Sequence, residues 1–423
     1  MLVRSDKTAY RYDRGACMKH WKILLVALVF PGCTSAPADL PPIGEGAIEI
    51  SRFLGEAVDS GSVRGVVALV ADRDGVIYHE AFGKQNVAED LDMAPDTIFR
   101  MYSMTKPVTS VGVMMLVEEG LIGMDDPVSR YLPELAARSV MDGIDLEAGT
   151  YTSRPASGEI TIRQLLTHTS GLGYAFSSPV LYRFLAPDQR ATGLPLLHDP
   201  GEQWTYGEST RVLGDLIEIV SGELLDTFLR NRILRPLGMD DTGYVVPEDR
   251  YPRLVTTHER QDGELVEVPN PDPPVYFEVR GDSRLTSTAP DYAIFLRMLL
   301  NEGQSGAARF LQPATVRTMR ENHIGDLRVE LQPVGDSALT RPFPLGAGRD
   351  TFGLGFQIAE PGGGPDTRSP GSYSWSGLQN THFWVDPVEG IAGVVLMQML
   401  PFYDEAAIAV LEGFEERVYR SLD

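Results

Sequence analysis

Two groups of strand-like segments lie at opposite ends of this 423-residue chain, and helical patterns fill the stretch between them. This order predicts one central sheet built from both ends of the chain, with a helical subdomain inserted between its halves. The turn Asp72–Gly75 predicts that the first two strands form a hairpin. The predicted strands are Gly65–Ala71, Val76–Phe82, Gly353–Ile358, Thr381–Val385 and Ile391–Gln398.

The fold class predicted from this pattern is α+β, in a single domain over residues 46–422. We expect the sheet to come from about 46–100 and 350–422, and the helical subdomain from about 101–300. Met141–Gly158 is predicted to be an exposed loop and Gln332–Gly348 a surface insertion. The predicted helices are Ala47–Asp59, Val108–Glu119, Ile160–Leu166, Val212–Ser221, a helix that starts near Pro290 and ends at Leu300, and Glu405–Leu422.

The first 38 residues have the features of an export signal followed by a linker. Basic residues at Lys19 and Lys22 precede an apolar run, 23–30, that is shorter than the roughly 20 residues needed to span a bilayer. Two interpretations remain open, a bacterial lipoprotein signal that lipidates Cys33 and ordinary cleavage after Ala38. We therefore expect an exported bacterial protein, either periplasmic or anchored in the outer membrane through a lipid on Cys33.

Charge and composition narrow the classes of partner. The net charge of −22 argues against nucleic-acid binding and against docking on anionic lipid. The only two cysteines, Cys17 and Cys33, lie in the predicted presequence, so no disulfide is expected in the mature domain. The histidines are scattered without metal-ligand spacing, and we expect neither a metal nor a cofactor.

Lysine is scarce, since only Lys84 and Lys106 follow the predicted presequence. Lys106 stands three residues after Ser103, and on a helix this spacing puts both side chains on one face. Arginine cannot lose its proton in a protein, whereas a buried lysine can. Pro107 places this pair in the first turn of a helix, where free backbone amides stabilise a developing anion. The pair is therefore typical of a nucleophilic serine with a lysine base.

Several segments, in this order, resemble the serine β-lactamase and penicillin-binding-protein-like superfamily. Within it, the chain is most similar to class C β-lactamases and, above all, to the family VIII carboxylesterases. The resemblance covers most of residues 47–422 and implies that family's fold, a central antiparallel sheet flanked by helices with a mainly helical subdomain. The segments that carry it are Phe99–Pro107, Ile162–Leu172, Gly201–Tyr206 with Val212–Gly214, and Leu285–Tyr292.

By this resemblance Ser103 is the nucleophile and Lys106 its partner. Tyr206 matches the tyrosine of the second motif, whose phenol moves a proton between the serine and the leaving group. Proximity to a lysine ammonium is expected to lower the pKa of Tyr206. Glu208 occupies the position where the family usually has an asparagine that holds a lactam amide. His168 is interpreted as structural, because the tyrosine and the lysine already account for the proton transfers.

The third motif of β-lactamases contains a lysine, and this chain has none after Lys106. The matching segment, Trp375–Gly377, resembles the Trp-x-Gly of the esterases. Trp375 would offer an apolar wall where the lysine would bind a carboxylate. The resemblance also implies an oxyanion hole made by the backbone amides of Ser103 and Leu378, next to Gly377.

The predicted function is therefore a serine hydrolase that forms an acyl-enzyme on Ser103, most simply a carboxylesterase for small neutral esters. Two alternatives stay open. One is a β-lactamase or a D-amino-acid peptidase of the penicillin-binding type, and the other is a non-catalytic scaffold with the same fold. The expected partner is a small ester or amide, and the sequence leaves the oligomeric state undetermined.

Overall fold

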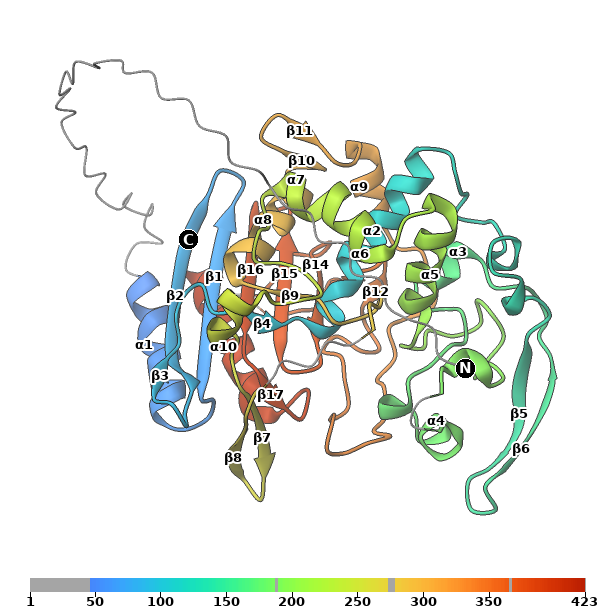
Figure 1. The fold of residues 1–423 in the computed structure, drawn as a ribbon, viewed down its shortest axis with the longest axis horizontal. Helices are drawn as coiled ribbons and strands as arrows, with labels where there is room; N and C mark the ends of the chain where they lie inside the picture. The colour runs from blue at the N-terminus through green and yellow to red at the C-terminus, as the bar shows by residue number, and fades with distance from the viewer. Residues whose placement is uncertain (1–45, 187–188, 273–277, 365–366, 423) are drawn as a thin grey trace, which may run out of the picture. The chain divides into compact units, whose positions relative to one another are not determined.

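The computed structural model describes residues 46–186, 189–272, 278–364 and 367–422, which belong to one compact unit. An eight-stranded antiparallel sheet runs in the order β12-β13-β14-β15-β16-β1-β2-β3. Figure 1 shows the blue strands of the first end beside the red strands of the last, which confirms the predicted sheet from both ends. The strands are β1 (Gly65–Asp72), β2 (Val76–Asn86), β3 (Leu91–Asp92), β12 (Thr351–Phe352), β13 (Gln357–Ile358), β14 (Tyr373–Gly377), β15 (Thr381–Asp386) and β16 (Ile391–Leu396).

Helices cover both faces of this sheet, because successive strand residues point to opposite faces and both sets are apolar. Val66, Ala68 and Val70 of β1 pack in one core with α1 (Gly46–Asp59) and α10 (Glu405–Arg420). The residues between them on β1, which point to the other face, are Val67, Leu69 and Ala71. They pack in the larger core with α8 (Ala289–Leu300) and α2 (Thr105–Glu118). The sheet is thus the middle layer between two helical layers.

The α2 helix is buried along almost its whole length, from Thr105 to Leu116. Its residues are nearly all apolar or small, and Pro107 lies in the first turn as predicted. Gly112 allows close packing, because an added Cβ would lie within 3.3 Å of Ile217, Phe228 and Leu229 on neighbouring helices. A buried helix of this kind holds its N-terminal residues in a fixed place.

The predicted helical subdomain contains helices that pack on α2, together with short strand pairs. The α5 helix (Ser209–Ser221) is capped by Gly222, whose positive φ suits the left-handed C-cap. The remaining elements are α3 (Ile162–Leu166), α4 (Pro179–Phe184), α5 (Ser209–Ser221), α6 (Leu225–Leu229), α7 (Arg235–Leu237), α9 (Pro313–Met319), β4 (Phe99–Arg100), β5 (Ser139–Asp145), β6 (Thr150–Pro155), β7 (Thr257–Gln261), β8 (Glu264–Val268), β9 (Thr286–Ser287), β10 (Gln304–Ser305), β11 (Ala308–Arg309) and β17 (Met399–Leu400).

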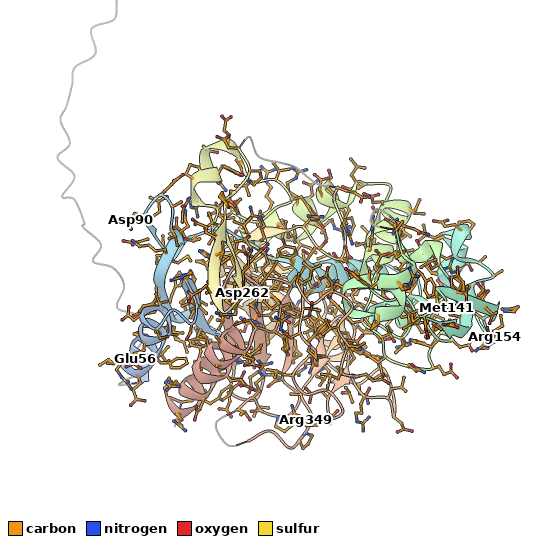
Figure 2. All side chains as sticks on the ribbon, turned by 90° about the horizontal axis from the view of Figure 1, so that it is seen from below. Glu56, Asp90, Met141, Arg154, Asp262 and Arg349 are labelled. Atoms are coloured by element: carbon orange, nitrogen blue, oxygen red, sulfur yellow. The ribbon has the colours of Figure 1, made fainter. Side chains whose placement is uncertain are left out.

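Three local predictions were wrong. Met141–Gly158 is not a loop, since β5 and β6 form a solvent-exposed hairpin there, on which Figure 2 shows Met141 and Arg154. Gly353–Ile358 is not one strand, because β12 and β13 are two short strands that pair with each other. Gln332–Gly348 is not a mere surface insertion, because Phe343 is buried in the main core.

The predicted export signal and Cys33 lie outside the described residues. Among the helices of the described part of the chain, none is long and apolar enough to cross a membrane.

Candidate functional site

Ser103 lies in a single 3₁₀ turn, Tyr102–Met104, between β4 and α2. The preceding residue, Tyr102, has a φ of 45°, a left-handed conformation that is unfavourable for a bulky residue. The backbone amide of Met101 donates to the carbonyl of Leu285, which fixes the start of the turn. Ser103 therefore sits at the entry to a rigid helix, as its sequence position predicts.

Lys106 is 2% exposed, and its Nζ lies 3.0 Å from Ser103 Oγ. The same Nζ donates to the backbone carbonyl of Asp282 at 2.8 Å and lies 5.2 and 4.9 Å from the ring centres of Tyr174 and Tyr206. Burial lowers the pKa of Lys106 to about 7, because the charged amine is costly to desolvate. Lys84, in contrast, forms surface ion pairs with two aspartates.

Tyr206 is buried and donates from Oη to Ser103 Oγ at 2.7 Å, so Ser103 contacts both predicted partners at once. The indole Nε1 of Trp375 lies 3.4 Å from the same Oη, at the long end of hydrogen-bond distance. The expected lowering of the pKa of Tyr206 is wrong. Burial raises that pKa well above the ordinary value, and the hydrogen bonds with Ser103 and Trp375 offset only part of this effect.

The end of β14 lies directly beside the Ser103 turn. A Cβ added at Gly377 would come within 2.3 Å of the Met101 carbonyl oxygen, so only glycine allows this approach. Leu378 follows Gly377 and packs on the main core. The structure thus brings Trp375, Gly377 and Leu378 to the same place as Ser103, as the resemblance implied.

A buried ion pair behind Lys106 was missed at the sequence level. Asp282 is 1% exposed and accepts two hydrogen bonds from Arg280, at 2.8 and 2.7 Å, and a short one from the Tyr174 hydroxyl. These donors and the nearby Lys106 hold the pKa of Asp282 well below its usual range, even though burial opposes them. The segment Arg280-Gly281-Asp282 has no recognisable motif, because its role depends on contacts distant in sequence.

Comparison with known proteins now places this geometry in a family. The model of the beta-lactamase family matches residues 50–412. The chain belongs to the beta-lactamase family. It is 31% identical over 395 residues to monacolin J acid methylbutanoyltransferase of Aspergillus terreus, which covers 86% of this chain and 93% of that protein.

Solved structures agree with this assignment. The structure of simvastatin synthase from Aspergillus terreus has a TM-score of 0.76 and 27% identity, covering 89% of this chain and 98% of that one. EstCE1, described as a hydrolase with promiscuous acyltransferase activity, has a TM-score of 0.69 and 25% identity, covering 89% of this chain and 99% of that one. These findings confirm the predicted superfamily, the fold and the general class, a serine-hydrolase-type enzyme of the beta-lactamase family.

Glu208, which stands where many family members have asparagine, is buried and takes part in local structure. Its carboxylate accepts from the Ala191 backbone amide at 2.8 Å and lies 3.4 Å from an Arg211 nitrogen.

His168 is buried against Tyr206, with ring centres 4.9 Å apart, and its Nδ1 lies 3.4 Å from the Gly207 amide. Burial lowers the pKa of His168 well below its ordinary value, and the structural role expected for this residue stays a prediction.

Part of the predicted surface insertion forms one wall of the site. Gln332 accepts a hydrogen bond from the Tyr206 backbone amide at 3.1 Å, and the ring of Phe343 lies edge-on to Tyr206 at 5.7 Å. Phe176 stacks on Tyr174 and Phe343. Aromatic rings thus surround the reactive hydroxyls, and these contacts between distant segments had no signal in the sequence.

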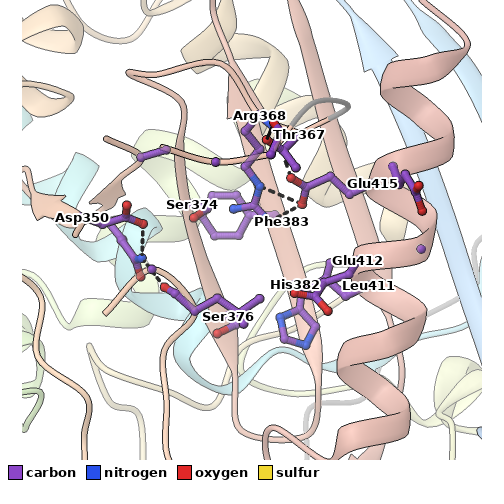
Figure 3. Close-up of a pocket in the computed structure, with 18 of the residues that line it drawn as sticks. Asp350, Thr367, Arg368, Ser374, Ser376, His382, Phe383, Leu411, Glu412 and Glu415 are labelled. Atoms are coloured by element: carbon purple, nitrogen blue, oxygen red, sulfur yellow. Dashed lines mark hydrogen bonds and ion pairs between the residues drawn. The ribbon is translucent and has the colours of Figure 1, made fainter. Parts of the chain in front are cut away.

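A cavity of about 700 Å³ lies on the opposite face of the sheet, between β14, β15 and α10 (Figure 3). Ser376 and His382 line it, as do their strand neighbours Trp375 and Phe383, which also pack in the main core. Ser103 and Lys106 do not contribute to it. The hydrogen-bonded group at Ser103, and not this cavity, is therefore the candidate site.

Among the described residues, no cluster of three or more potential ligand side chains could hold a metal ion.

Proposed function

We propose that this enzyme cleaves neutral carboxylic esters through an acyl-enzyme on Ser103. The observation that carries the proposal is the pair of contacts at Ser103 Oγ, 2.7 Å to the Tyr206 hydroxyl and 3.0 Å to the Lys106 amine. Burial lowers the pKa of Lys106 and raises the pKa of Tyr206, so both groups are held in their neutral forms. Neutral Lys106 can accept a proton, and neutral Tyr206 can donate one.

In the acylation step, Ser103 Oγ attacks the ester carbonyl carbon and its proton passes to Lys106. The carbonyl oxygen becomes an oxyanion, and we assign its stabilisation to the backbone amides of Ser103 and Leu378, as the family resemblance implies. As the carbon–oxygen bond to the leaving group breaks, Tyr206 protonates the departing alkoxide and regains a proton from the Lys106 ammonium. The products of this step are the free alcohol and an ester on Ser103.

In the second step, water attacks the Ser103 ester and reverses the proton path. Tyr206 takes a proton from the water as it gives its own proton to Lys106. When the carbon–oxygen bond to Ser103 breaks, Lys106 returns that proton to Ser103 Oγ and the carboxylic acid is released. An alcohol in place of water would give a new ester by the same route. The transferase and hydrolase relatives support this choice of acceptors, because both reactions share one acyl-enzyme.

The lining of the site favours a neutral acyl group. Trp375, Tyr174 and Phe343 provide apolar surface around Tyr206. Arg280, a cation close to Lys106, is already bound to Asp282, and Glu208 is bound within the protein. A substrate carboxylate would therefore lose its hydration without gaining the lysine that the third motif usually provides.

A substrate panel tests this preference. We expect p-nitrophenyl butyrate to be hydrolysed with a kcat/KM about 10- to 100-fold above that for nitrocefin or D-alanyl peptides, since a missing charged hydrogen bond costs about 1.5–3 kcal/mol. Background rates come from the Ser103→Ala variant. A higher kcat/KM for nitrocefin or the peptides would instead establish the β-lactamase or peptidase alternative. Failure of a fluorophosphonate to label Ser103 would support the non-catalytic scaffold.

We also propose that the chain is exported, on the strength of the basic residues and the apolar run in its first 38 residues. In a Gram-negative host, intact mass should show a mature chain that begins at a lipidated Cys33 or at Asp39. Cys33→Ser should release the protein from the membrane fraction in the first case and change nothing in the second, with Cys17→Ser as the control. An uncleaved chain in the cytoplasm would contradict export.

A further inference from the structure

We propose that the Arg280–Asp282 ion pair is a positioning element that sets, through Lys106, the pH range in which Ser103 is activated. This inference rests on the proposed function and adds two residues to it. Asp282 is a fully buried carboxylate that neither contacts Ser103 nor takes part in the steps described above. A buried ion pair is costly to desolvate. Its position directly behind the reactive amine therefore indicates that it has a function at the site.

The segment that carries the pair is held against α2 by three side chains from the first turns of that helix. The Leu285 amide donates to the Thr105 hydroxyl at 3.2 Å, Lys106 donates to the Asp282 carbonyl at 2.8 Å, and the Thr109 hydroxyl donates to the Gly281 carbonyl at 2.7 Å. A Cβ at Gly281 would come within 2.5 Å of the Thr210 carbonyl oxygen, so the segment is also fixed against α5. The distance between the carboxylate and the amine is therefore set by the fold.

The groups that face Lys106 divide into charged and neutral ones. Tyr206 and Tyr174 are phenols whose pKa burial raises, and His168 is neutral because burial lowers its pKa. The charged groups are Asp282, Arg280 and Glu208. Asp282 and Glu208 favour the protonated amine, whereas Arg280 and burial favour the neutral one.

These opposing influences give the pair a testable signature. Without its charge, Asp282 would no longer offset burial, and Lys106 would lose its proton at lower pH. Without Arg280, the carboxylate would act unopposed, and Lys106 would keep its proton to higher pH. Each substitution is expected to shift the pKa of Lys106 by about one unit. This is the lower end of the effect that a charge within a few ångströms has on a pKa.

The experiment is the pH dependence of kcat/KM for p-nitrophenyl butyrate between pH 5 and 9. In the wild type the rate should fall on the acidic side with an apparent pKa of about 7, as Lys106 becomes protonated. Asp282→Asn should lower the apparent pKa of this acidic limb of the pH profile by about one unit, and Arg280→Gln should raise it by about one unit. General damage to the site would lower the rate at every pH without moving the limb.

Glu415→Gln is the matched control, because it removes the carboxylate partner of Arg368 in a part-buried ion pair on the α10 face. This variant should keep the wild-type limb. If Asp282→Asn does not fold, the shift of Arg280→Gln, whose side chain is partly exposed, decides alone. The inference would be overturned if neither variant changed the apparent pKa of the acidic limb, or if both changed it in the same direction. Full activity of Ser103→Ala would instead overturn the proposed function.

Discussion

Replacing Ser103 by alanine should reduce ester hydrolysis to the background rate, a loss of at least about 10⁴-fold in kcat. The hydroxyl oxygen is the atom that forms the acyl bond, and it is hydrogen-bonded to both Lys106 and Tyr206. The loss should appear in kcat, with p-nitrophenyl butyrate as substrate, while the fold remains intact. The free energy of unfolding, measured with urea, should stay within about 1 kcal/mol of the wild-type value, because the change removes one partly buried hydroxyl.

Ser110→Ala provides a control for this variant. Ser110 lies on α2, the helix that follows the Ser103 turn. It is buried, and its hydroxyl has no hydrogen-bond partner in the described part of the chain. Its replacement should leave kcat close to the wild-type value. Turnover by Ser103→Ala at more than a few per cent of the wild-type rate would show that another group attacks the ester.

Replacing Lys106 by arginine should lower kcat by about 10²–10⁴-fold, although the positive charge is kept. A guanidinium does not release its proton, so it cannot accept the one from Ser103. Its planar head is also larger than the amine that fits between the rings of Tyr174 and Tyr206. The variant should remain nearly inactive even at pH 9, where the amine of the wild-type enzyme is neutral.

Lys84, the other lysine in the described part of the chain, supplies the matched control. Lys84 forms exposed ion pairs with Asp90 and Asp92, contacts that arginine can also make. Lys84→Arg should therefore keep full activity and the same pH profile. If Lys106→Arg recovered wild-type rates at high pH, the lysine would act only as a positive charge and not as the base.

Local patterns were enough to predict much of the fold and the chemical centre. The Ser103 turn, the lysine one turn later and the strands at both chain ends each depend on residues close together in sequence, so their spacing is visible before folding. The β5–β6 hairpin was missed because its residues are exposed, and an exposed strand pair lacks the apolar alternation that marks a buried one.

What the sequence could not show are interactions between segments that meet only in the folded chain. Asp282 lies behind Lys106 although it is 176 positions away, and Phe343 reaches Tyr206 from a segment that looked like a surface insertion. The pKa of Tyr206 was misjudged for the same reason. The family resemblance implied a lysine close to Tyr206, whereas the depth to which Tyr206 is buried, the larger influence on its pKa, depends on the whole fold.

The central claim is that all turnover passes through Ser103, and modification by a fluorophosphonate tests it most directly. Enzyme samples modified to different extents would be analysed by peptide mass spectrometry and assayed with p-nitrophenyl butyrate. We predict that activity falls in direct proportion to the fraction of Ser103 that carries the phosphonyl group and reaches background at complete modification. Substantial activity in enzyme whose Ser103 is fully modified would contradict the claim.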